Sequence, residues 1–336
     1  MKFIGVEEHF SSNIINEEVA KYGKASYLQN LPKEVNEKFA KMRFTTPVLE
    51  EIGQDRLDFM AYHQVDMQII SYTNPVPDSV PKEKAVELCK KANDILAEKI
   101  KKYPDKFKAF ATLPMASPID AAIELERCVK EYGFVGALIS GTYQNKFYDD
   151  EEFLPIFKKA EELDVPISWH PEFIDSKILE HYYLSSNYST LIGMQFGSAG
   201  FGWHLDVGLH MTRLVLSGIF DKFPNLKFIS GHYGETIPAM LDRMDQIMTQ
   251  EQTGLKKPIS AYFKENIYYT PSGIISNNQL EYVVKVFGAS HILWALDYPY
   301  VPFKSSFASF LLNANLTDEE IELIAHKNAE KLFHLN

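Results

Sequence analysis

Side chains that bind divalent metals follow several short apolar runs of this sequence. Glu7 and His9 follow the first of these runs, His170 and His232 follow two central ones, and Asp297 follows the last. In an extended segment, side chains two residues apart project to the same side, so Glu7 and His9 can reach one ion together. Two imidazoles and two carboxylates are ligands that suit Zn²⁺ or Mn²⁺. The residue types therefore predict a divalent metal site.

Each of these residues also has a more ordinary interpretation. Taken singly, Glu7 or Asp297 fits a solvated or capping carboxylate, and His170 fits a hydrogen-bonded histidine at a strand end. Their joint occurrence after apolar runs favours the metal site. By the same alternation, Glu8 is expected to point away from the ion. Five other histidines are expected on the surface or in packing contacts: His63, His181, His291, His326 and His334. His204 and His210 are intermediate candidates between these and the expected site residues.

Short apolar, β-branched or aromatic runs alternate with longer amphipathic stretches along the whole chain. The strands and helices that these patterns predict must position the candidate metal ligands. The expected strands are Lys2–Val6, Met67–Ser71, Phe107–Leu113, Val135–Ile139, Pro166–Trp169, Leu226–Ser230, Ile267–Thr270 and Ile292–Ala295. Expected helices include Lys82–Lys102, Ile119–Tyr132, Glu152–Leu163 and Thr236–Thr249. About eight repeats of strand and helix predict parallel strands with helical crossovers, and hence a closed (β/α)8 barrel of the α/β class. Barrel sites lie at the carboxyl ends of strands, where the candidate ligands fall.

Two segments are longer than the loops usual in such a barrel. They run from Phe10 to about Pro47, after the first strand, and from Pro171 to about Gly208, after the fifth. Both follow strands that carry candidate ligands, so each is expected to act as a lid or a wall of the site. The aromatic residues of the second segment fit a pocket lining, an oligomer contact or packing beneath a long loop equally well. Without a linker-like stretch, residues 1–336 are expected to form a single domain.

Composition narrows the classes of function. The 336 residues are 46% hydrophobic and 24% charged, which is typical of a folded globular protein. Acidic residues number 45 against 34 basic ones, the net charge is −11, and no basic block stands out. These features argue against a nucleic-acid partner or an anionic membrane surface, both of which need a basic footprint. A small-molecule substrate is favoured.

The two cysteines, Cys89 and Cys128, are too few and too far apart for a disulfide scaffold or a metal pair, so both are expected to be buried or inert. The apolar residues 3–6 are too short for the core of a signal peptide. No stretch approaches the 18 consecutive apolar residues of a membrane span. The expected location is the cytoplasm.

Four motifs of the sequence resemble those of a known family. They are Glu7-Glu8-His9, Ile167–Pro171, Gly231–Glu235 with Arg243, and Asp297-Tyr298-Pro299. Together they resemble the ACMSD-like branch of the amidohydrolase superfamily, and within it the nonoxidative decarboxylases of γ-resorcylate, 2,3-dihydroxybenzoate and 5-carboxyvanillate. The resemblance continues over nearly the whole chain, through Ala92–Asp94, Phe110–Pro114, Gly133–Ala137, Glu161–Pro166, Ser217–Asp221 and Asn328–Phe333.

The resemblance implies a mononuclear site. In it one Zn²⁺ or Mn²⁺ ion is bound by Glu7, His9, His170 and Asp297, with no organic cofactor. His232, oriented by Glu235, faces the substrate beside the metal. The implied reaction is decarboxylation of an ortho-hydroxybenzoate-type acid in either direction, in which the ring is protonated before CO₂ leaves. Asp297 is the implied proton donor, and it titrates together with His232 as a coupled pair.

The resemblance also assigns two arginines and an assembly. Arg243 is expected close to the site as a structural or anion-binding residue. Arg56 resembles an arginine that some members direct at the substrate from a neighbouring subunit; a solvated helix position is the alternative. A homodimer or homotetramer is expected. The family pattern is not followed by residues 294–296 before Asp297, by residues 300–301 after Pro299, or by Glu172 and Phe173 after His170. These departures leave the identity of the aromatic acid open.

Two other functions use the same residues. A metal-bound water, deprotonated by Asp297, could attack a lactone or related carbonyl while His232 polarises its oxygen. A protein that binds metal without catalysing a reaction is the third class, since a fold alone does not fix a function. A hydrolase incorporates solvent oxygen into its product, whereas a decarboxylase releases CO₂ and incorporates solvent hydrogen.

Overall fold

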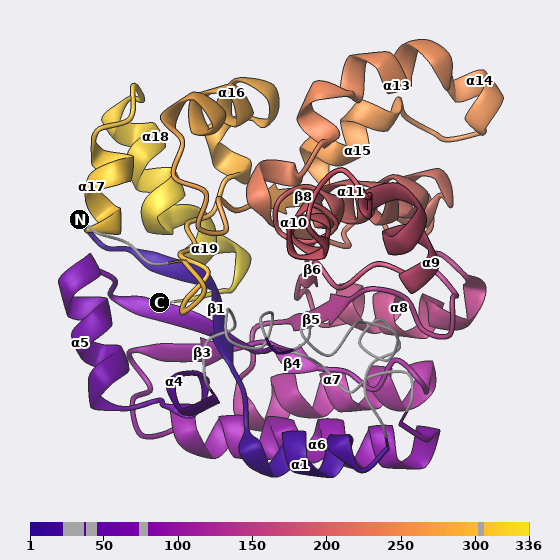
Figure 1. Ribbon diagram of the computed structural model, residues 1–336. Coiled ribbons are helices and arrows are strands. Elements are labelled where there is room, and N and C mark those ends of the chain that lie inside the picture. The colour runs from indigo at the N-terminus through magenta and orange to yellow at the C-terminus, as the bar shows by residue number, and fades with distance from the viewer. Residues whose placement is uncertain (23–36, 38–45, 74–79, 302–305, 336) are drawn as a thin grey trace.

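Parallel strands surrounded by helices form the body of the protein (Figure 1). The computed structural model describes residues 1–22, 37, 46–73, 80–301 and 306–335. The strands are β1 (Ile4–Phe10), β2 (Met67–Tyr72), β3 (Phe107–Ala109), β4 (Ala111–Thr112), β5 (Ala137–Ser140), β6 (Ile167–His170), β7 (Phe228–Ser230) and β8 (Ile267–Tyr269). Each matches an expected run to within a few residues. The eighth expected strand appears as isolated parallel bridges within residues 292–298.

Two ladders of parallel strands are joined into a ring. The first has the order β1-β2-β3 and the second the order β4-β5-β6-β7-β8. Only Phe110 separates β3 from β4, and its amide donates to Ile70 O while the next amide donates to Gly136 O. At the other edges, Leu293 N donates to Tyr269 O and Val6 N donates to Trp294 O, each at 2.8 Å. Residues 292–298 therefore close the ring between β8 and β1, as a (β/α)8 barrel requires.

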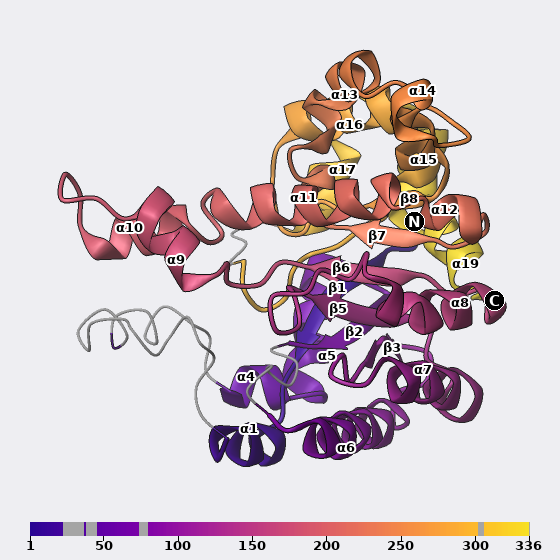
Figure 2. The ribbon, with the colours of Figure 1, turned by 90° about the vertical axis from the view of Figure 1, so that its right-hand side faces the viewer.

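Helices follow the strands along the chain, and both views show them around the barrel (Figures 1 and 2). They are α1 (Asn13–Ala20), α4 (Thr46–Glu50), α5 (Gln54–His63), α6 (Lys82–Ile100), α7 (Pro118–Tyr132), α8 (Leu154–Glu162), α9 (Ser176–Ile178), α10 (Thr190–Phe196), α11 (Gly202–Leu216), α12 (Ile219–Lys222), α13 (Leu241–Ile247), α14 (Gln250–Thr253), α15 (Ile259–Glu265), α16 (Asn277–Phe287), α17 (Phe307–Leu312), α18 (Asp318–Glu322) and α19 (Asn328–Leu332). Short 3-10 turns and two π-helical turns complete them.

Local sequence explains where these helices begin and end, as α7 shows. Pro118 occupies its first turn, where a missing amide costs nothing, and Gly133 ends it with φ of 67°. Between them, Ala121, Leu125 and Cys128 recur at helical spacing and are fully buried. This apolar stripe holds α7 against the strands.

The barrel interior is a buried cluster separate from the larger one between strands and helices. It takes Ile4, Val6, Ile69, Phe110, Val135, Leu138, Ile229, Tyr268 and Leu293 from successive strand positions, together with Ala329, Leu332 and Phe333 at α19. Lys2, just before β1, forms an ion pair with Glu330 of α19 at 2.8 Å. Helix α19 therefore closes the amino end of the barrel, which leaves the carboxyl ends of the strands for a site.

The long segment after β6 is helical rather than an irregular loop. It contains α9, the π-helical turn η2 (Leu179–Tyr183) and α10, which project from the body before the chain returns along α11 (Figure 2). Ile174, Leu179, Tyr183 and Met194 form a small apolar cluster of its own. Tyr182, by contrast, is 70% exposed. Much of the other long segment, from Phe10 to about Pro47, lies outside the described residues.

Two further expectations concern the cysteines and the membrane. Cys89 and Cys128 are buried and free, as expected. Burial raises the pKa of both thiols above the ordinary range, so neither is a reactive thiolate. Among the described residues, no helix combines the length and the apolar character that crossing a bilayer needs.

Candidate metal centre

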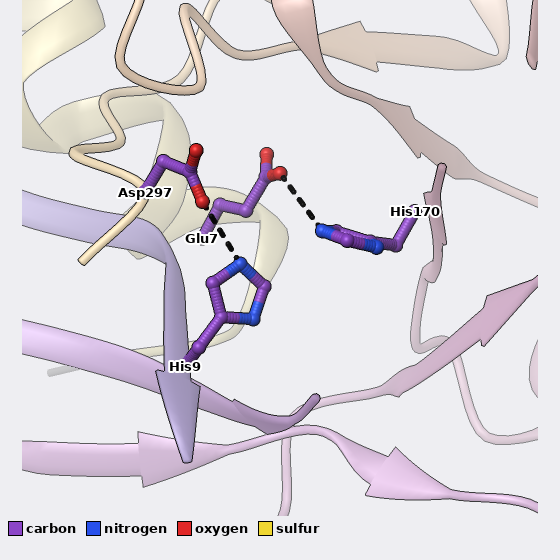
Figure 3. Close-up of side chains that lie close together, drawn as sticks. All are labelled: Glu7, His9, His170 and Asp297. Carbon is purple, nitrogen blue, oxygen red and sulfur yellow. Dashed lines mark hydrogen bonds and ion pairs between the residues drawn. The ribbon is translucent and has the colours of Figure 1, made fainter. Parts of the chain in front are cut away.

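Four side chains predicted as metal ligands come together at the carboxyl ends of the strands (Figure 3). Glu7 and His9 extend from β1, His170 ends β6, and Asp297 lies in residues 292–298. One potential ligand atom from each lies within 4.8 Å of the others. His9 Nε2 is 3.1 Å from Asp297 Oδ1, and His170 Nε2 is 3.9 Å from Glu7 Oε1. The arrangement converges on a single point from three parts of the barrel.

An irregularity in β1 determines how these side chains are presented. The pairing of β1 with β2 shifts by one residue between Gly5 and Glu8, which is the signature of a β-bulge. The Glu8 carboxylate turns away from the cluster and accepts hydrogen bonds from Leu296 N at 2.9 Å and Tyr298 N at 3.2 Å. It fits beside Gly5, where a Cβ would lie only 2.4 Å from Glu8 Oε1. Glu8 thus holds the backbone on both sides of Asp297.

Two hydroxyl groups from the segment that follows β8 hold Glu7. Thr270 Oγ1 donates to Glu7 Oε2 at 3.0 Å, and Ser272 Oγ donates to the same oxygen. Ser272 Oγ in turn accepts from His232 N at 3.0 Å. A Cβ at Gly231 would lie 2.7 Å from Ser272 Oγ, so only glycine allows this approach. These hydroxyls escaped the sequence reasoning because neither residue type is a preferred metal ligand.

The two imidazoles of the cluster are neutral. Burial lowers the pKa of His9 to about 4 and that of His170 to about 4. His170 Nδ1 donates to Pro171 O at 2.7 Å, which leaves the lone pair on Nε2, the nitrogen that faces Glu7. A metal ligand needs such a free lone pair, and a carbonyl partner on the other nitrogen is typical of ligating histidines.

The two carboxylates differ in acidity. Burial opposes ionisation of Glu7, yet the neighbouring histidines, above all His232, hold its pKa below the usual range. Burial and the Glu7 charge raise the pKa of Asp297 well above its usual range. Asp297 is therefore the weaker acid of this pair. Its backbone adopts φ of 60°, a left-handed conformation uncommon for a non-glycine residue and frequent at functional sites.

The donor set fits a divalent cation. Two neutral imidazoles and two carboxylates are the mixed nitrogen and oxygen ligands of Zn²⁺ and Mn²⁺. His170 is 20% exposed and Asp297 15%, whereas His9 is fully buried, so a small molecule reaches the cluster from one side. The cluster can hold an ion and leave part of its surface open to a ligand.

A second cluster of His204, His232 and Glu235 lies beside the first. Glu235 accepts from His232 Nδ1 at 2.9 Å through one oxygen and contacts His204 Nδ1 at 2.5 Å through the other. Burial lowers the pKa of His232, but the adjacent Glu235 carboxylate outweighs it and raises the pKa to about 9. His232 is therefore cationic at neutral pH. Both His232 and Glu235 have positive φ, of 46° and 59°.

His204 was only an intermediate candidate in the sequence. Its contact with Glu235 joins α11 to the loop after β7, across 31 residues. No spacing rule predicts which turn of a helix meets a given loop, so the sequence carries no signal for this pair.

Of the two arginines, Arg56 lies differently from its expected position. Arg56 is completely buried in α5, where Nη2 donates to His9 O at 2.6 Å and Nε donates to Glu51 O at 3.1 Å. Its guanidinium also lies 4.4 Å from the centre of the Tyr298 ring. This is neither a solvated helix position nor one turned toward another subunit; Arg56 supports the backbone of β1. Arg243 lies on α13 and is exposed, and its expected role near the site stays a prediction.

Comparisons with known proteins identify relatives of this chain. The family model described as amidohydrolase matches residues 25–335. A gamma-resorcylate decarboxylase of Polaromonas sp. is 34% identical over 299 residues, which cover 86% of this chain and 89% of that protein.

Solved structures give the same result. A putative amidohydrolase from Staphylococcus aureus is 42% identical with a TM-score of 0.85, and the match covers 100% of both chains. A dihydroxybenzoic acid decarboxylase from Polaromonas sp. JS666, with bound manganese and the inhibitor 2-nitroresorcinol, is 31% identical with a TM-score of 0.84. That match covers 100% of this chain and 97% of the other. With this fold and this similarity over nearly its whole length, the chain belongs to the amidohydrolase family.

Proposed function

We propose that this protein is a metal-dependent, nonoxidative decarboxylase of an ortho-hydroxybenzoate-type aromatic acid. The observation that carries the proposal is the convergence of Glu7, His9, His170 and Asp297 at the strand ends, with protonated His232 close by. The relatives support it, since they include decarboxylases of gamma-resorcylate and of dihydroxybenzoic acid. The enzyme class is a carbon–carbon lyase.

In this proposal Glu7, His9, His170 and Asp297 hold one divalent ion. Manganese is supported by the neighbouring structure that contains it, and Zn²⁺ remains an alternative because it accepts the same donors. When bound, the ion would fix the carboxylate and the ortho-hydroxyl of the acid and offset their negative charge. No organic cofactor is part of the proposal.

The protein's own residues supply the proton that the reaction needs. The reaction consumes one proton: the aryl carboxylate and H⁺ give the arene and CO₂, and the electron pair of the broken C–C bond stays with the ring carbon. Asp297, whose pKa is raised, is the proposed donor to that carbon. His232, whose pKa is raised to about 9, faces the substrate as a cation. It titrates together with Asp297 as a coupled pair. Glu235 orients His232 through the bond to Nδ1.

The proposal extends to the form of the protein. Residues 1–336 act as a single domain in the cytoplasm and assemble as a homodimer or homotetramer. Exposed apolar side chains on α10 and α11 support self-association, because a buried contact would remove Ile192, Phe196 and Leu209 from water. Light scattering that gives the mass of one chain, 38.5 kDa, would refute the assembly.

The test of the activity uses metal-loaded protein in D₂O. Mn²⁺- and Zn²⁺-loaded samples are incubated with a panel of ortho-hydroxybenzoates and, separately, with several lactones. We expect CO₂ release and a phenol that carries deuterium at the former carboxyl position. Lactone opening with solvent oxygen in the product, and no CO₂ from any acid, would show that the same residues serve a hydrolase instead.

A further inference from the structure

His204 can act on His232 through the Glu235 carboxylate, which lies between the two imidazoles. It is the third residue of α11, and its side chain is 18% exposed, whereas that of Glu235 is completely buried. Glu235 uses one oxygen for each imidazole: Oε1 for His232 Nδ1 at 2.9 Å and Oε2 for His204 Nδ1 at 2.5 Å. The two rings are 4.8 Å apart and inclined at 68°, so they meet the carboxylate from different directions.

The hydrogen-bond partners of His204 fix its protons. His204 Nε2 lies 3.0 Å from Ala199 O, and a carbonyl oxygen can only accept, so Nε2 carries a hydrogen. His204 Nδ1 then faces a carboxylate oxygen at 2.5 Å, a contact that requires a second proton between the two atoms. The pair therefore shares one proton next to the carboxylate that orients His232.

A second metal ion explains this cluster less well. Zn²⁺ binds nitrogen and oxygen ligands at about 2.0–2.2 Å, which places two tetrahedral ligand atoms about 3.3 Å apart. The 2.5 Å separation of His204 Nδ1 from Glu235 Oε2 is shorter than that and corresponds to direct hydrogen bonding. His204 Nε2 is already occupied by Ala199 O.

We propose that His204 is a positioning residue for His232, which it holds in place through Glu235. By occupying Oε2, His204 fixes the carboxylate plane so that Oε1 stays directed at His232 Nδ1, and its proton offsets part of the charge of a buried carboxylate. The proposal rests on the proposed function for its effect on turnover, but the hydrogen-bonded pair itself can be tested without any substrate.

The first test compares three substitutions of His204 in the metal-loaded enzyme. Asparagine places an amide donor near the position of Nδ1, so His204→Asn should keep most of the turnover, whereas His204→Ala and His204→Leu should lower kcat by about 10-fold to 100-fold, as loss of such orienting partners does. KM should change little, because His204 does not touch the substrate. Equal loss in all three variants, or a loss confined to KM, would overturn the proposal.

A double-mutant cycle locates the effect in Glu235. In a Glu235→Gln background, His204→Ala should cost little more, because the carboxylate through which it acts is already gone. His210→Asn is the matched control, since it removes another histidine–carboxylate pair of the same helix, His210 with Asp206. Its effect should add to that of Glu235→Gln without coupling. Additive losses for His204→Ala and Glu235→Gln would contradict the proposal.

A spectroscopic measurement separates this proposal from the proposed function. With ¹⁵N-histidine labelling, the short His204–Glu235 contact should give a strongly downfield, exchange-protected Nδ1–H proton signal, which His204→Asn removes while the His232 Nδ1–H signal remains. Metal analysis should give the same ion content for the wild type and His204→Asn. A missing signal, or one ion lost per chain in the variant, would overturn the positioning role even if the enzyme decarboxylates aromatic acids.

Discussion

Asp297 combines three features that are typical of functional residues. It belongs to the candidate ligand set, burial and Glu7 raise its pKa well above the usual range, and it adopts a left-handed backbone conformation. Glu8 accepts hydrogen bonds from the amides of both neighbouring residues, which holds this conformation in place. A residue that costs backbone strain and desolvation at once is more readily explained by a reaction than by stability.

Replacing Asp297 by asparagine separates proton donation from metal binding. Asp297→Asn keeps an oxygen for the ion but removes the transferable proton, so kcat should fall by about 100-fold to 10,000-fold, the usual contribution of a general acid. Metal content, measured on the same sample, should remain near one ion per chain. Asp105→Asn, an exposed substitution, is the control. Turnover that survives in Asp297→Asn would assign the donor to another group.

Metal removal should be visible as a loss of stability. A ligand at 100 times its dissociation constant stabilises the folded state by about 2.7 kcal/mol, so Mn²⁺ should raise the Tm of the chelator-treated protein by several degrees. His170→Ala should abolish most of this rise, because it removes a ligand whose lone pair is already free. His181→Ala, at an exposed histidine, should leave the rise intact. An unchanged Mn²⁺ effect in His170→Ala would place the ion elsewhere.

For single residues, the sequence indicated the four candidate ligands, but it did not indicate the residues that hold them in place. Glu7, His9, His170 and Asp297 follow apolar runs, and the carboxyl ends of parallel strands meet at one end of a barrel, so pattern and topology together bring them close. Ser272 and His204 contact the site through loops and a helix turn whose placement depends on tertiary packing. Arg56 has an ordinary helical context in the sequence, and only the structure shows it against the β1 backbone.

Among the elements, β1 and residues 292–298 act as one unit because a buried carboxylate joins them. Burial raises the pKa of Glu8 from 4.5 to about 8, although its two backbone donors and Arg56 oppose this. Between these two values the folded protein binds a proton that the unfolded chain has lost. The free energy of unfolding therefore falls as the pH rises from 4.5 to about 8.

Glu8→Gln should remove this contribution to the pH dependence. The amide does not titrate, so the decline in the free energy of unfolding between pH 5 and 8 should become shallower, although one of the two backbone bonds is lost. Urea unfolding of metal-free protein at pH 5, 6.5 and 8 measures the slope. Glu131→Gln, at an exposed carboxylate, should keep the wild-type slope. If Glu8→Gln keeps it too, Glu8 is ionised throughout this range.

The projecting segment of α9, η2 and α10 should unfold separately from the barrel. Its cluster of Ile174, Leu179, Tyr183 and Met194 is small and distinct from the main core. Met194→Ala should destabilise the segment by about 2–5 kcal/mol, the usual cost of such a truncation. Hydrogen exchange should then accelerate in residues 171–200 and stay slow in β5–β7. Val207→Ala, which affects the main core through α11, should instead accelerate exchange beyond this segment.

Element positions were predictable where a local pattern determines them. The strands and the helices α6 and α7 follow hydrophobic periodicity and clear stop residues such as Gly133. The segment after β6 was expected as a long loop, because its short helices are too brief and too aromatic to show helical periodicity. The last expected strand forms only bridges, since residues 292–298 bend to place Asp297 with φ of 60°.

The whole molecule is a ring whose closure and whose candidate ligand set depend on the same residues. Residues 292–298 pair with β1 through Glu8 and with β8 through Ile292, and they also contribute Asp297. His9 and Asp297 are in contact although 288 residues separate them in the sequence. Contacts between such distant residues form slowly, because the chain must order most of its length first.

This separation has a consequence for synthesis. A ribosome releases the chain from its amino end, so Glu7 and His9 emerge before His170, and His170 emerges before Asp297. A nascent chain that ends before residue 297 therefore lacks one of the four candidate ligands. If the four candidates bind one ion as proposed, its binding with all four requires the closed barrel, and a translation product that ends before residue 292 cannot form the complete site.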